Sequence, residues 1–331
     1  MSQGRVRRGH AGEVDPAKLS ALSRVLYPDA PRLEPMPPGA DCLWVEHDDE
    51  ISACAALGMS QEMRDAPGET GWIGHYEARD AEAGSAVLRE GARLLTERGA
   101  WRVLGPLNGN TWRRYRVALE SRPDDPLRDP PFFAGEPRNP FAYADHFTSA
   151  GFTLAASYES RIVEVAAGRT PHSELPPGIR LRPFEVERFS EEMTRIYELS
   201  LEAFADNAYY SPIGREAFFA LYEPIRPLLD PNLVLLAEDE SGALVGYLFS
   251  YPDPTQSAPR RLIAKTLAVA RRSRGLGLGS HLLAEIGARA ADLGYGEVMH
   301  ALMHVDNRST HLSGRQRAQL YRRYALYQWG R

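Results

Sequence analysis

The sequence predicts a mixed α/β fold, an α+β arrangement on a mixed sheet, and three observations lead to this prediction. Short apolar runs typical of strands precede a turn and an amphipathic helix, and a further strand follows that helix. Such a strand–helix–strand unit predicts a parallel crossover near the centre of a sheet. The same order occurs twice along 331 residues, which allow two ordinary domains.

Composition narrows the class of protein. Apolar residues make up 43% and charged residues 25%, which is typical of globular proteins, and the net charge of −5 argues against a broad nucleic-acid surface. No apolar run approaches the ~20 residues that span a bilayer. Cys42 and Cys54 alone form neither a disulfide framework nor a zinc site. We therefore expect a cytoplasmic protein with no metal, no nucleic-acid partner and no membrane partner.

A polar stretch rich in proline and glycine at residues 166–178 divides the chain. It predicts two domains, 1–165 and 179–331, joined by a linker at 166–178. A second proline-rich stretch, at about 113–140, reads as an insertion in the first domain.

In the first half, apolar runs predict strands at 44–47, 51–59, 72–76 and 101–107, with a helix before the last of them. A short helix within 141–152 and a strand at 158–165 follow.

In the second half, a strand at 179–184 precedes a helix at 189–205, whose apolar residues fall on one face, and a helix at 214–221. Strands are predicted at 233–238, 244–251 and 262–269. A helix then runs from near Ser280 to about Leu293, where Gly294 takes the place of a C-terminal cap. Strands at 298–305 and 321–329 end the half.

The two halves also share sequence. With an offset of 195, residues 79–103 lie over 274–298 without a gap, and seven of 25 positions are identical. We interpret the chain as two copies of one fold.

The strongest motif is the segment Arg274–Gly279, RGLGLG, between a predicted strand and a predicted helix. Glycines let the backbone approach a ligand closely, and the start of the following helix presents free N–H groups to a phosphate. Ser280 stands where a dinucleotide fingerprint needs its third glycine, and no Walker triplet occurs. Nicotinamide and nucleoside triphosphate ligands are therefore disfavoured.

The segment Val269–Leu283, VARRSRGLGLGSHLL, resembles the coenzyme A pyrophosphate loop of the GNAT superfamily of N-acetyltransferases. Arg274, Gly277 and Gly279 stand at the three positions of that family's pattern. Downstream, VDNRS at Val305–Ser309 resembles the strand end and asparagine that open the family's fourth helix. The resemblance implies two tandem GNAT-like acyl-CoA N-acyltransferase folds.

This resemblance also implies a site. Acetyl-CoA, the co-substrate, would lie in a split between strands 262–269 and 298–305, with its pantetheine along Leu267 and Val269 and within reach of Asn307. A small-molecule amine would attack the thioester directly. The pyrophosphate would rest on the amides of Arg274, Gly275, Leu276, Gly277, Leu278, Gly279 and Ser280.

The first half departs from this pattern. At the same offset Asp80 stands over Gly275 and Glu82 over Gly277. Carboxylates in this position would repel a pyrophosphate. We therefore expect a degenerate first lobe that binds no coenzyme A and serves packing or the substrate pocket.

Candidate catalytic residues come from several strands, because Gly314 stands where many GNAT members carry a tyrosine acid. Strand alternation places His300, His304 and Asp306 on one face, with His304 as a candidate base. Tyr324 is a candidate acid.

Three further tyrosines are candidate substrate contacts: Tyr209 and Tyr210 in a loop, and Tyr247 on a central strand. Lys265 is notable as a lysine on an interior strand. In the segment Gly105–Arg116 a polar cluster at a strand end is followed by three arginines: Asn108, Asn110, Thr111 and Trp112, then Arg113, Arg114 and Arg116. This segment predicts either a polar bend with solvated arginines or an acceptor pocket between lobes that recognises a carboxylate or phosphate.

Three functions remain open from the sequence. They are an acetyl-CoA-dependent N-acetyltransferase, a GNAT-fold protein that binds coenzyme A or a metabolite without turnover, and an acyltransferase with another acyl-CoA donor. Either a monomer or a homodimer is expected.

Overall fold

The computed structural model describes the chain except residues 1–4, 30–33, 38, 64–65, 166–173 and 331. The first half contributes seven strands and three helices: β1 (Val6–His10), α1 (Pro16–Leu26), β2 (Asp41–His47), β3 (Glu50–Ser60), β4 (Thr70–Ala78), α2 (Ala81–Glu97), β5 (Arg102–Gly105), β6 (Val117–Ala118), α3 (Tyr143–Ser149) and β7 (Thr153–Glu164). The second half contributes β8 (Arg180–Pro183), α4 (Phe189–Phe204), α5 (Arg215–Tyr222), β9 (Val234–Glu238), β10 (Leu244–Ser257), β11 (Arg260–Val269), α6 (Leu278–Asp292), β12 (Glu297–His304), α7 (Arg308–Arg315) and β13 (Gln319–Gly330).

The thirteen strands of the described residues belong to one sheet, in the order β1-β2-β3-β4-β5-β13-β7-β12-β11-β10-β9-β8, with β6 beside β13. The pairs β4–β5 and β11–β12 are parallel, while the other neighbours are antiparallel. The predicted mixed α/β fold with parallel crossovers is therefore confirmed.

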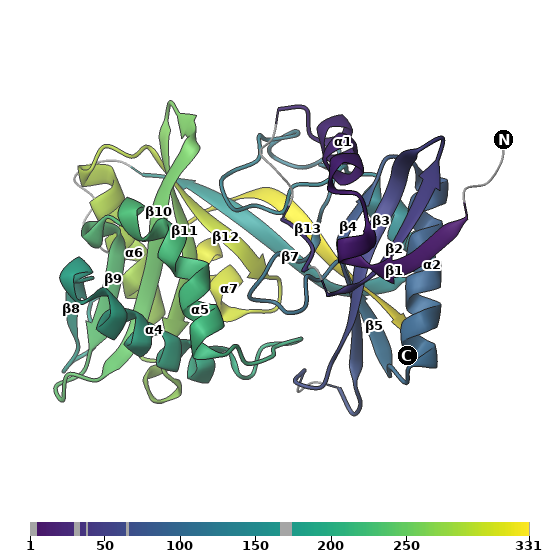
Figure 1. Ribbon diagram of the computed structural model, residues 1–331. Coiled ribbons are helices and arrows are strands. Elements are labelled where there is room, and N and C mark those ends of the chain that lie inside the picture. Colours follow the sequence, from purple (N-terminus) through teal and green to yellow (C-terminus); the bar gives the residue numbers. More distant parts are fainter. Residues whose placement is uncertain (1–4, 30–33, 38, 64–65, 166–173, 331) are drawn as a thin grey trace.

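The final strands of the two halves are exchanged. β7, from the first half, pairs with β12 of the second, and β13, from the second half, pairs with β5 of the first. Figure 1 shows β7 and β13 crossing the centre of the molecule side by side, so that the C-terminus lies beside β5. The sheet is thus continuous across both halves, and each half is completed by a strand of the other.

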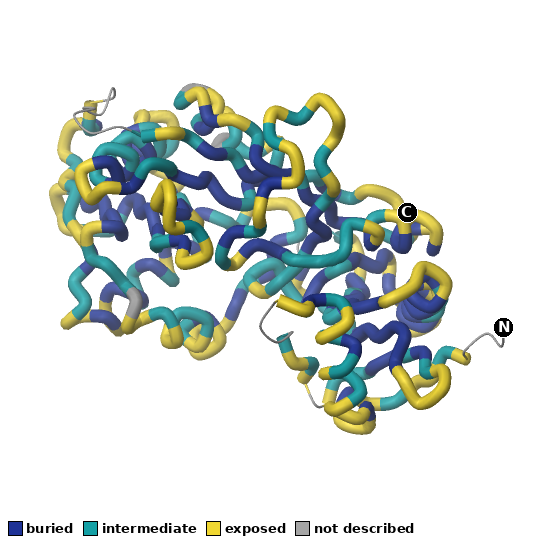
Figure 2. Tube along the Cα trace, turned by 90° about the horizontal axis from the view of Figure 1, so that it is seen from above, coloured by how far each residue is buried: buried dark blue, intermediate teal, exposed yellow. Residues whose placement is uncertain are grey.

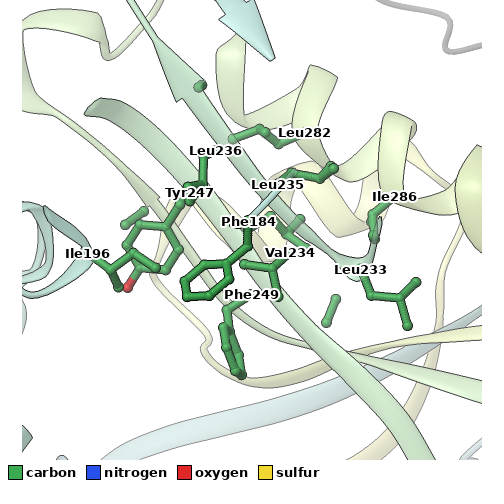
Figure 3. Packing of buried hydrophobic residues seen from close by; sticks show 14 of the residues in the cluster. Phe184, Ile196, Leu233, Val234, Leu235, Leu236, Tyr247, Phe249, Leu282 and Ile286 are labelled. Carbon is green, nitrogen blue, oxygen red and sulfur yellow. The ribbon is translucent and has the colours of Figure 1, made fainter. Parts of the chain in front are cut away.

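Each half has its own apolar core. In the second half, α4 and α6 pack against the strands, and Figure 3 shows Phe184, Ile196, Leu235, Leu282 and Ile286 in this core. In the first half α2 covers the sheet through an apolar face. Buried segments run through both halves in Figure 2.

Most predicted elements are confirmed, and the differences have local causes. α6 begins at Leu278, before the expected Ser280, because the positive φ of Gly277 (89°) sets the helix start. β10 extends to Ser257, beyond the predicted end at Tyr251. β1 and α1 were not predicted, since β1 is charged and half exposed and α1 buries only Leu22. Residues 166–173 of the predicted linker lie outside the described residues.

Candidate active site

The second half of the sheet opens between β11 and β12. These parallel strands pair from Arg261 with Glu297 to Ala264 with His300, and the described residues make no further ladder between them. β12 turns instead to β7, with a bulge between His300 and Met303. The rest of β11 therefore offers its backbone edge to an extended ligand, as an exposed sheet edge does for a peptide.

A cavity of about 1030 Å³ occupies this opening and is large enough for a small ligand together with part of a cofactor. Both halves line it. The first half supplies Thr111, Trp112, Tyr115, Arg116, Ala134, Gly135 and Tyr158, and the predicted site residues among its lining are Tyr210, Leu267, His300, His304, Asp306 and Asn307.

The loop from β11 to α6 presents backbone amides at a helix start. Gly275 and Gly277 have φ values of 85° and 89°, which favour glycine. No atom lies within 4 Å of a Cβ built at either position, so space is open above the loop. Gly277 is the N-cap of α6 and no side chain caps this end. The unoccupied N–H groups and the helix dipole suit an anion.

The Arg274 side chain holds this loop in place. Its guanidinium donates to the carbonyl of Ala203 at 2.7 Å and lies 3.4 Å from Asp206 Oδ2, both near the end of α4. The backbone N–H of Arg271 also donates to Glu202 Oε1 at 2.7 Å. The loop is therefore tied to α4 from two points, which fixes the direction of its amides.

The other predicted coenzyme A residues are distributed around the same opening. Leu267 and Asn307 line the cavity, and Asn307 is the N-cap of α7. Leu276 is 60% exposed on the loop, whereas Leu278 is buried in the core. The remaining three, Val269, Gly279 and Ser280, are half-buried at the end of β11 and the start of α6.

His304 lines the cavity at the end of β12. Its Nδ1 accepts the backbone N–H of Asp306 at 3.2 Å, so the proton of the neutral ring lies on Nε2. Burial lowers its pKa, which the Asp306 carboxylate partly opposes and the Arg116 guanidinium reinforces. His304 is therefore a neutral hydrogen-bond donor at neutral pH, and the base role expected from the sequence does not fit this tautomer.

His300 is buried deeper on the same strand. Its Nδ1 lies 2.8 Å from Ser313 Oγ, and its Nε2 has no hydrogen-bond partner among the described residues. Burial, with the nearby Arg161, lowers its pKa to about 4, so the ring is neutral. It lines the cavity as a neutral polar group.

Tyr324 and Tyr247 lie apart from the cavity lining. Tyr324 is fully buried; its hydroxyl donates to Glu136 and lies 3.0 Å from Ser160 Oγ. The Tyr247 hydroxyl lies 2.7 Å from Ser200 Oγ within the core of Figure 3. Burial raises the pKa of both phenols. The predictions of Tyr324 as an acid and Tyr247 as a substrate contact are corrected here, because a central strand buries its inward-facing aromatics.

The loop after α4 brings one of its two tyrosines into the site. Tyr210 is buried and lines the cavity, whereas Tyr209 lies outside the lining and donates its hydroxyl to the carbonyl of Ala155 at 2.9 Å. Tyr209 has a φ of 60°, which turns the two neighbouring side chains apart. Asp306 lines the cavity mouth with an exposed carboxylate.

Two cations of the lining were not chosen as site residues from the sequence. Lys265, on β11, projects into the cavity, where surrounding protein and then the Arg116 guanidinium lower its pKa. Arg116 comes from the predicted segment Gly105–Arg116 of the first half, which contributes Thr111 and Trp112 as well. That segment does reach a pocket between the halves, although its Asn108 lines a separate cavity of about 540 Å³.

The corresponding opening in the first half is closed by the chain itself. β4 and β5 pair only from Thr70 with Arg102 to Trp72 with Leu104. Beyond that point the backbone N–H of Leu107 donates to the carbonyl of Ile73 at 2.8 Å. The N–H of Ala78 donates to the Tyr143 hydroxyl at 2.8 Å. The strand edge is therefore occupied by internal groups.

The connection after β4 is also short. Only residues 79–80 separate β4 from α2, whereas residues 270–277 separate β11 from α6. Asp80 is the N-cap of α2, and its Oδ1 accepts the N–H of Ala83 at 2.8 Å. The predicted offset of 195 holds at the helix ends, Glu97 and Asp292, but the helix starts require 197. Asp80 therefore takes the place of Gly277, and the expected pairing with Gly275 is wrong.

Among the described residues there is neither a helix suited to crossing a membrane nor a cluster suited to binding a metal. None of their helices has the length and apolar character needed to cross a bilayer. Their His, Cys, Asp and Glu side chains form no group of three or more that is arranged to hold a metal ion.

The sequence of residues 191–315 matches the model of the acetyltransferase (GNAT) family. This match spans α4 to α7 and therefore includes β11, the glycine loop and β12. No curated protein matches the sequence.

Solved structures resemble the whole chain. A GCN5-related N-acetyltransferase from Sphaerobacter thermophilus has a TM-score of 0.55 at 18% identity, covering 98% of this chain and 95% of that one. A tandem GNAT protein from the clavulanic acid biosynthesis pathway has a TM-score of 0.57 at 16% identity, with 98% of each chain covered. A probable N-acyltransferase from Enterococcus faecalis reaches 0.59 at 10% identity, covering 99% and 72%. At these identities the likeness shows the fold, that of two-lobe GNAT proteins.

Proposed function

Because the chain carries a GNAT N-acyltransferase domain at residues 191–315 within a two-lobe GNAT fold, we propose that its second half transfers acetyl from acetyl-CoA to an amine. In this proposal residues 179–331 form the catalytic lobe and residues 1–165 form a degenerate one. The observation that supports it is the uncapped start of α6 beside the open edge of β11.

The chain's own groups suggest how coenzyme A would be held. The amides of Gly275 and Gly277 face open space and would accept the pyrophosphate. The free edge of β11 at Leu267 and Val269 would pair with the pantetheine as an added strand. Asn307, at the cavity, supplies an amide within the same opening.

The transfer needs a position for the amine and a path for one proton. The amine nitrogen would attack the thioester carbonyl, the carbon–sulfur bond would break, and a proton from the nitrogen would pass to the departing thiolate. His304 would keep its own proton and donate its Nε2–H as a hydrogen bond to the sulfur, since its Nδ1 is held by the backbone N–H of Asp306.

Calorimetric titration with acetyl-CoA tests the binding part of the proposal. We expect one site per chain in the native protein and at least about 100-fold weaker binding, or about 2.7 kcal/mol, in Gly277→Glu. The new carboxylate would occupy the anion seat, as Asp80 does in the first half. Gly242→Glu is the matched control, since Gly242 has a φ of 79° and open space but lies in the β9–β10 turn.

The outcomes separate the alternatives. Two sites per chain would contradict a degenerate first lobe, and no binding in the native protein would contradict the proposed function. Tighter binding of propionyl-CoA or a longer acyl-CoA would replace the acetyl donor. Binding at one site without acetylation of any amine in a broad panel would indicate a non-catalytic coenzyme A-binding protein.

A further inference from the structure

Two positive side chains line the large cavity without an acidic partner. Lys265 Nζ has no hydrogen bond or ion pair among the described residues, and it lies 6.0 Å from the centroid of the Tyr251 ring. Arg116 lies between the rings of Tyr115 and Tyr158, at 3.9 and 4.2 Å from their centroids. No carboxylate among the described residues pairs with either cation.

Arg116 is held rigidly in this position. Its backbone has a φ of 72°, in the left-handed region that a residue with a side chain rarely adopts. Its Nη1 donates to the carbonyl of Leu302 at 2.8 Å, and Leu302 has a φ of 58° at the bulge of β12. Strained backbone at two contacting positions is typical of a functional site.

The acidic residues of the lining are engaged elsewhere or exposed. Asp206 pairs with Arg271 at 2.6 Å and lies 3.4 Å from Arg274, so it belongs to the loop anchor. Asp306 is exposed at the mouth, 3.9 Å from His304 Nδ1. The cavity therefore holds two cations without an acidic partner among the described residues: Arg116 is buried, whereas the Lys265 side chain is exposed within the opening. Surrounding protein and the nearby Arg116 guanidinium lower the pKa of Lys265.

The wall around these cations is mostly apolar. It contains Trp112, Phe204, Leu221, Tyr222, Ile225, Leu229, Leu248, Phe249, Pro252 and Pro254. A ligand that suits both features carries one anionic group and an apolar body. Lys265 lies two residues from Leu267 on β11, or ~7 Å along the strand, so the anion would sit within one small molecule's length of the proposed thioester.

We propose that the acceptor is an amine that also carries a carboxylate and an apolar side group, such as an apolar amino acid, and that Lys265 and Arg116 hold this carboxylate. The inference rests on the proposed function and adds its substrate class. A carboxylate suits this pair because its two oxygens can bind one to each cation: Arg116 Nη1 is bound to Leu302, but its Nε is buried and has no hydrogen-bond partner among the described residues.

The chain has only two lysines, Lys18 and Lys265, which allows a direct test. Lys18 lies on the first half and is paired with Glu46 and Asp49, so it serves as an internal control. After reductive ¹³C-methylation the two lysine signals are followed by NMR, with coenzyme A present. The added probes are N-acetyl-leucine and N-acetyl-phenylalanine, their carboxamides, and phenyl phosphate.

We expect the acids to shift the Lys265 signal and to raise the pKa of Lys265, because a bound carboxylate favours the charged amine. The Lys18 signal should stay in place, and the carboxamides should have no effect. No shift with either acid, or an equal shift with the carboxamides, would overturn the proposal. A larger response to phenyl phosphate would replace the carboxylate with a phosphate.

Substitution then tests the role in catalysis. Lys265→Met keeps the length of the side chain and removes its charge, and Lys18→Met is the matched control. We expect Lys265→Met to raise KM for leucine or phenylalanine at least about 10-fold, while the KM for 2-phenylethylamine and the affinity for acetyl-CoA stay within about twofold.

These readouts separate the two proposals. Absence of acetyl-CoA binding overturns the proposed function, while the NMR titration still decides whether the cation pair binds carboxylates. Acetyl-CoA binding at one site, with equal use of amines that have and lack a carboxylate, overturns this inference alone.

Discussion

In the first half the helix after the parallel strand begins with a carboxylate, and in the second half the equivalent helix begins with a bare backbone. Asp80 Oδ1 accepts the N–H of Ala83 at 2.8 Å, whereas Gly277 leaves the start of α6 uncapped. The same contrast holds at the strand edge, where Tyr143 occupies the N–H of Ala78. Buried polar groups need partners, so a site that no ligand fills is stabilised by the chain's own side chains.

In the second half, the equivalent backbone N–H groups at the strand edge and the helix start are not occupied by side chains of the described residues. Its loop has six more residues and two positive-φ glycines, and the cavity of about 1030 Å³ contains two cations that pair with no carboxylate among the described residues. Such features lower the unfolding free energy of the free protein, and a bound ligand offsets this loss. The comparison therefore shows that the first half satisfies its strand edge and helix start with its own groups, whereas the second half leaves the equivalent groups open to the proposed ligand.

The largest expected effect concerns the independence of the halves. Residues 179–331 expressed alone would lack β7, and β12 would lose its partners from Glu164 to Tyr158. We expect this fragment to show no cooperative urea unfolding by circular dichroism, because an exposed central strand leaves the core incomplete. Adding residues 1–165 as a separate chain should restore the transition. A fragment that unfolds cooperatively on its own would show that the strand exchange is dispensable.

The second-largest expected effect is the pH dependence that Glu77, a buried carboxyl of the first half, gives to the unfolding free energy. Glu77 accepts the hydroxyls of Tyr27 and Tyr143, and burial raises its pKa to about 7 against the opposing effect of these bonds. The folded protein thus binds a proton more tightly than the unfolded chain. This stabilisation is complete below pH ~4.5 and is lost as the pH rises through 7, a change of about 3 kcal/mol.

Glu77→Gln should remove this dependence of the unfolding free energy on pH. The difference in unfolding free energy between native protein and variant, measured in urea at pH 5 and pH 8, reports it. Glu238 in the second half provides the opposite case: three arginine hydrogen bonds outweigh burial and lower its pKa to about 2, so its contribution is lost only as the pH falls below about 4.5. If the unfolding free energies of native protein and Glu77→Gln changed equally between pH 5 and pH 8, the raised pKa assigned to Glu77 would be contradicted.

A smaller effect is expected from the arginine that anchors the loop. Arg274→Ala removes the bonds to Ala203 and Asp206 and should weaken acetyl-CoA binding about 10-fold, since the amides lose their fixed direction. Arg79→Ala is the control, because Arg79 pairs with Glu50 on the surface of the first half. Equal affinities in calorimetry for both variants would show that the anchor has no part in binding.

The smallest effect is expected for the exchanged strand. Tyr324→Phe removes hydrogen bonds to Glu136 and Ser160 and should cost about 1 kcal/mol of unfolding free energy. The kcat of acetyl transfer should be unchanged, since Tyr324 lies outside the cavity lining. Tyr247→Phe, which loses its contact with Ser200, is the counterpart in the second half. A large fall in kcat for Tyr324→Phe would return this tyrosine to the catalytic machinery.

The sequence was informative where local pattern determines structure. The helix α4 and the strands β9 and β11 follow from periodicity, and the glycine loop follows from its motif. The exchange of β7 and β13 was not predictable, because alternation indicates which face of a strand is buried and not which strand lies beside it.

The candidate site was predictable only in part, for the same kind of reason. Leu267, His304 and Asn307 do line one cavity, since their strands adjoin in any fold of this type. Arg116 joins them through a positive φ and a contact across 186 residues of sequence, which no local pattern records.

The exchanged strand has a consequence for synthesis on the ribosome. Gly105 of β5 pairs with Tyr327 of β13, so β5 lacks this neighbour until β13 has been made. At ~5–20 residues per second, that delay is roughly 10–45 s. During this interval the edge of β5 is exposed, and nascent chains can pair with one another there. Chaperone demand during translation should therefore concentrate on the N-terminal half. In the folded protein this same half has its strand edge and helix start occupied by its own groups.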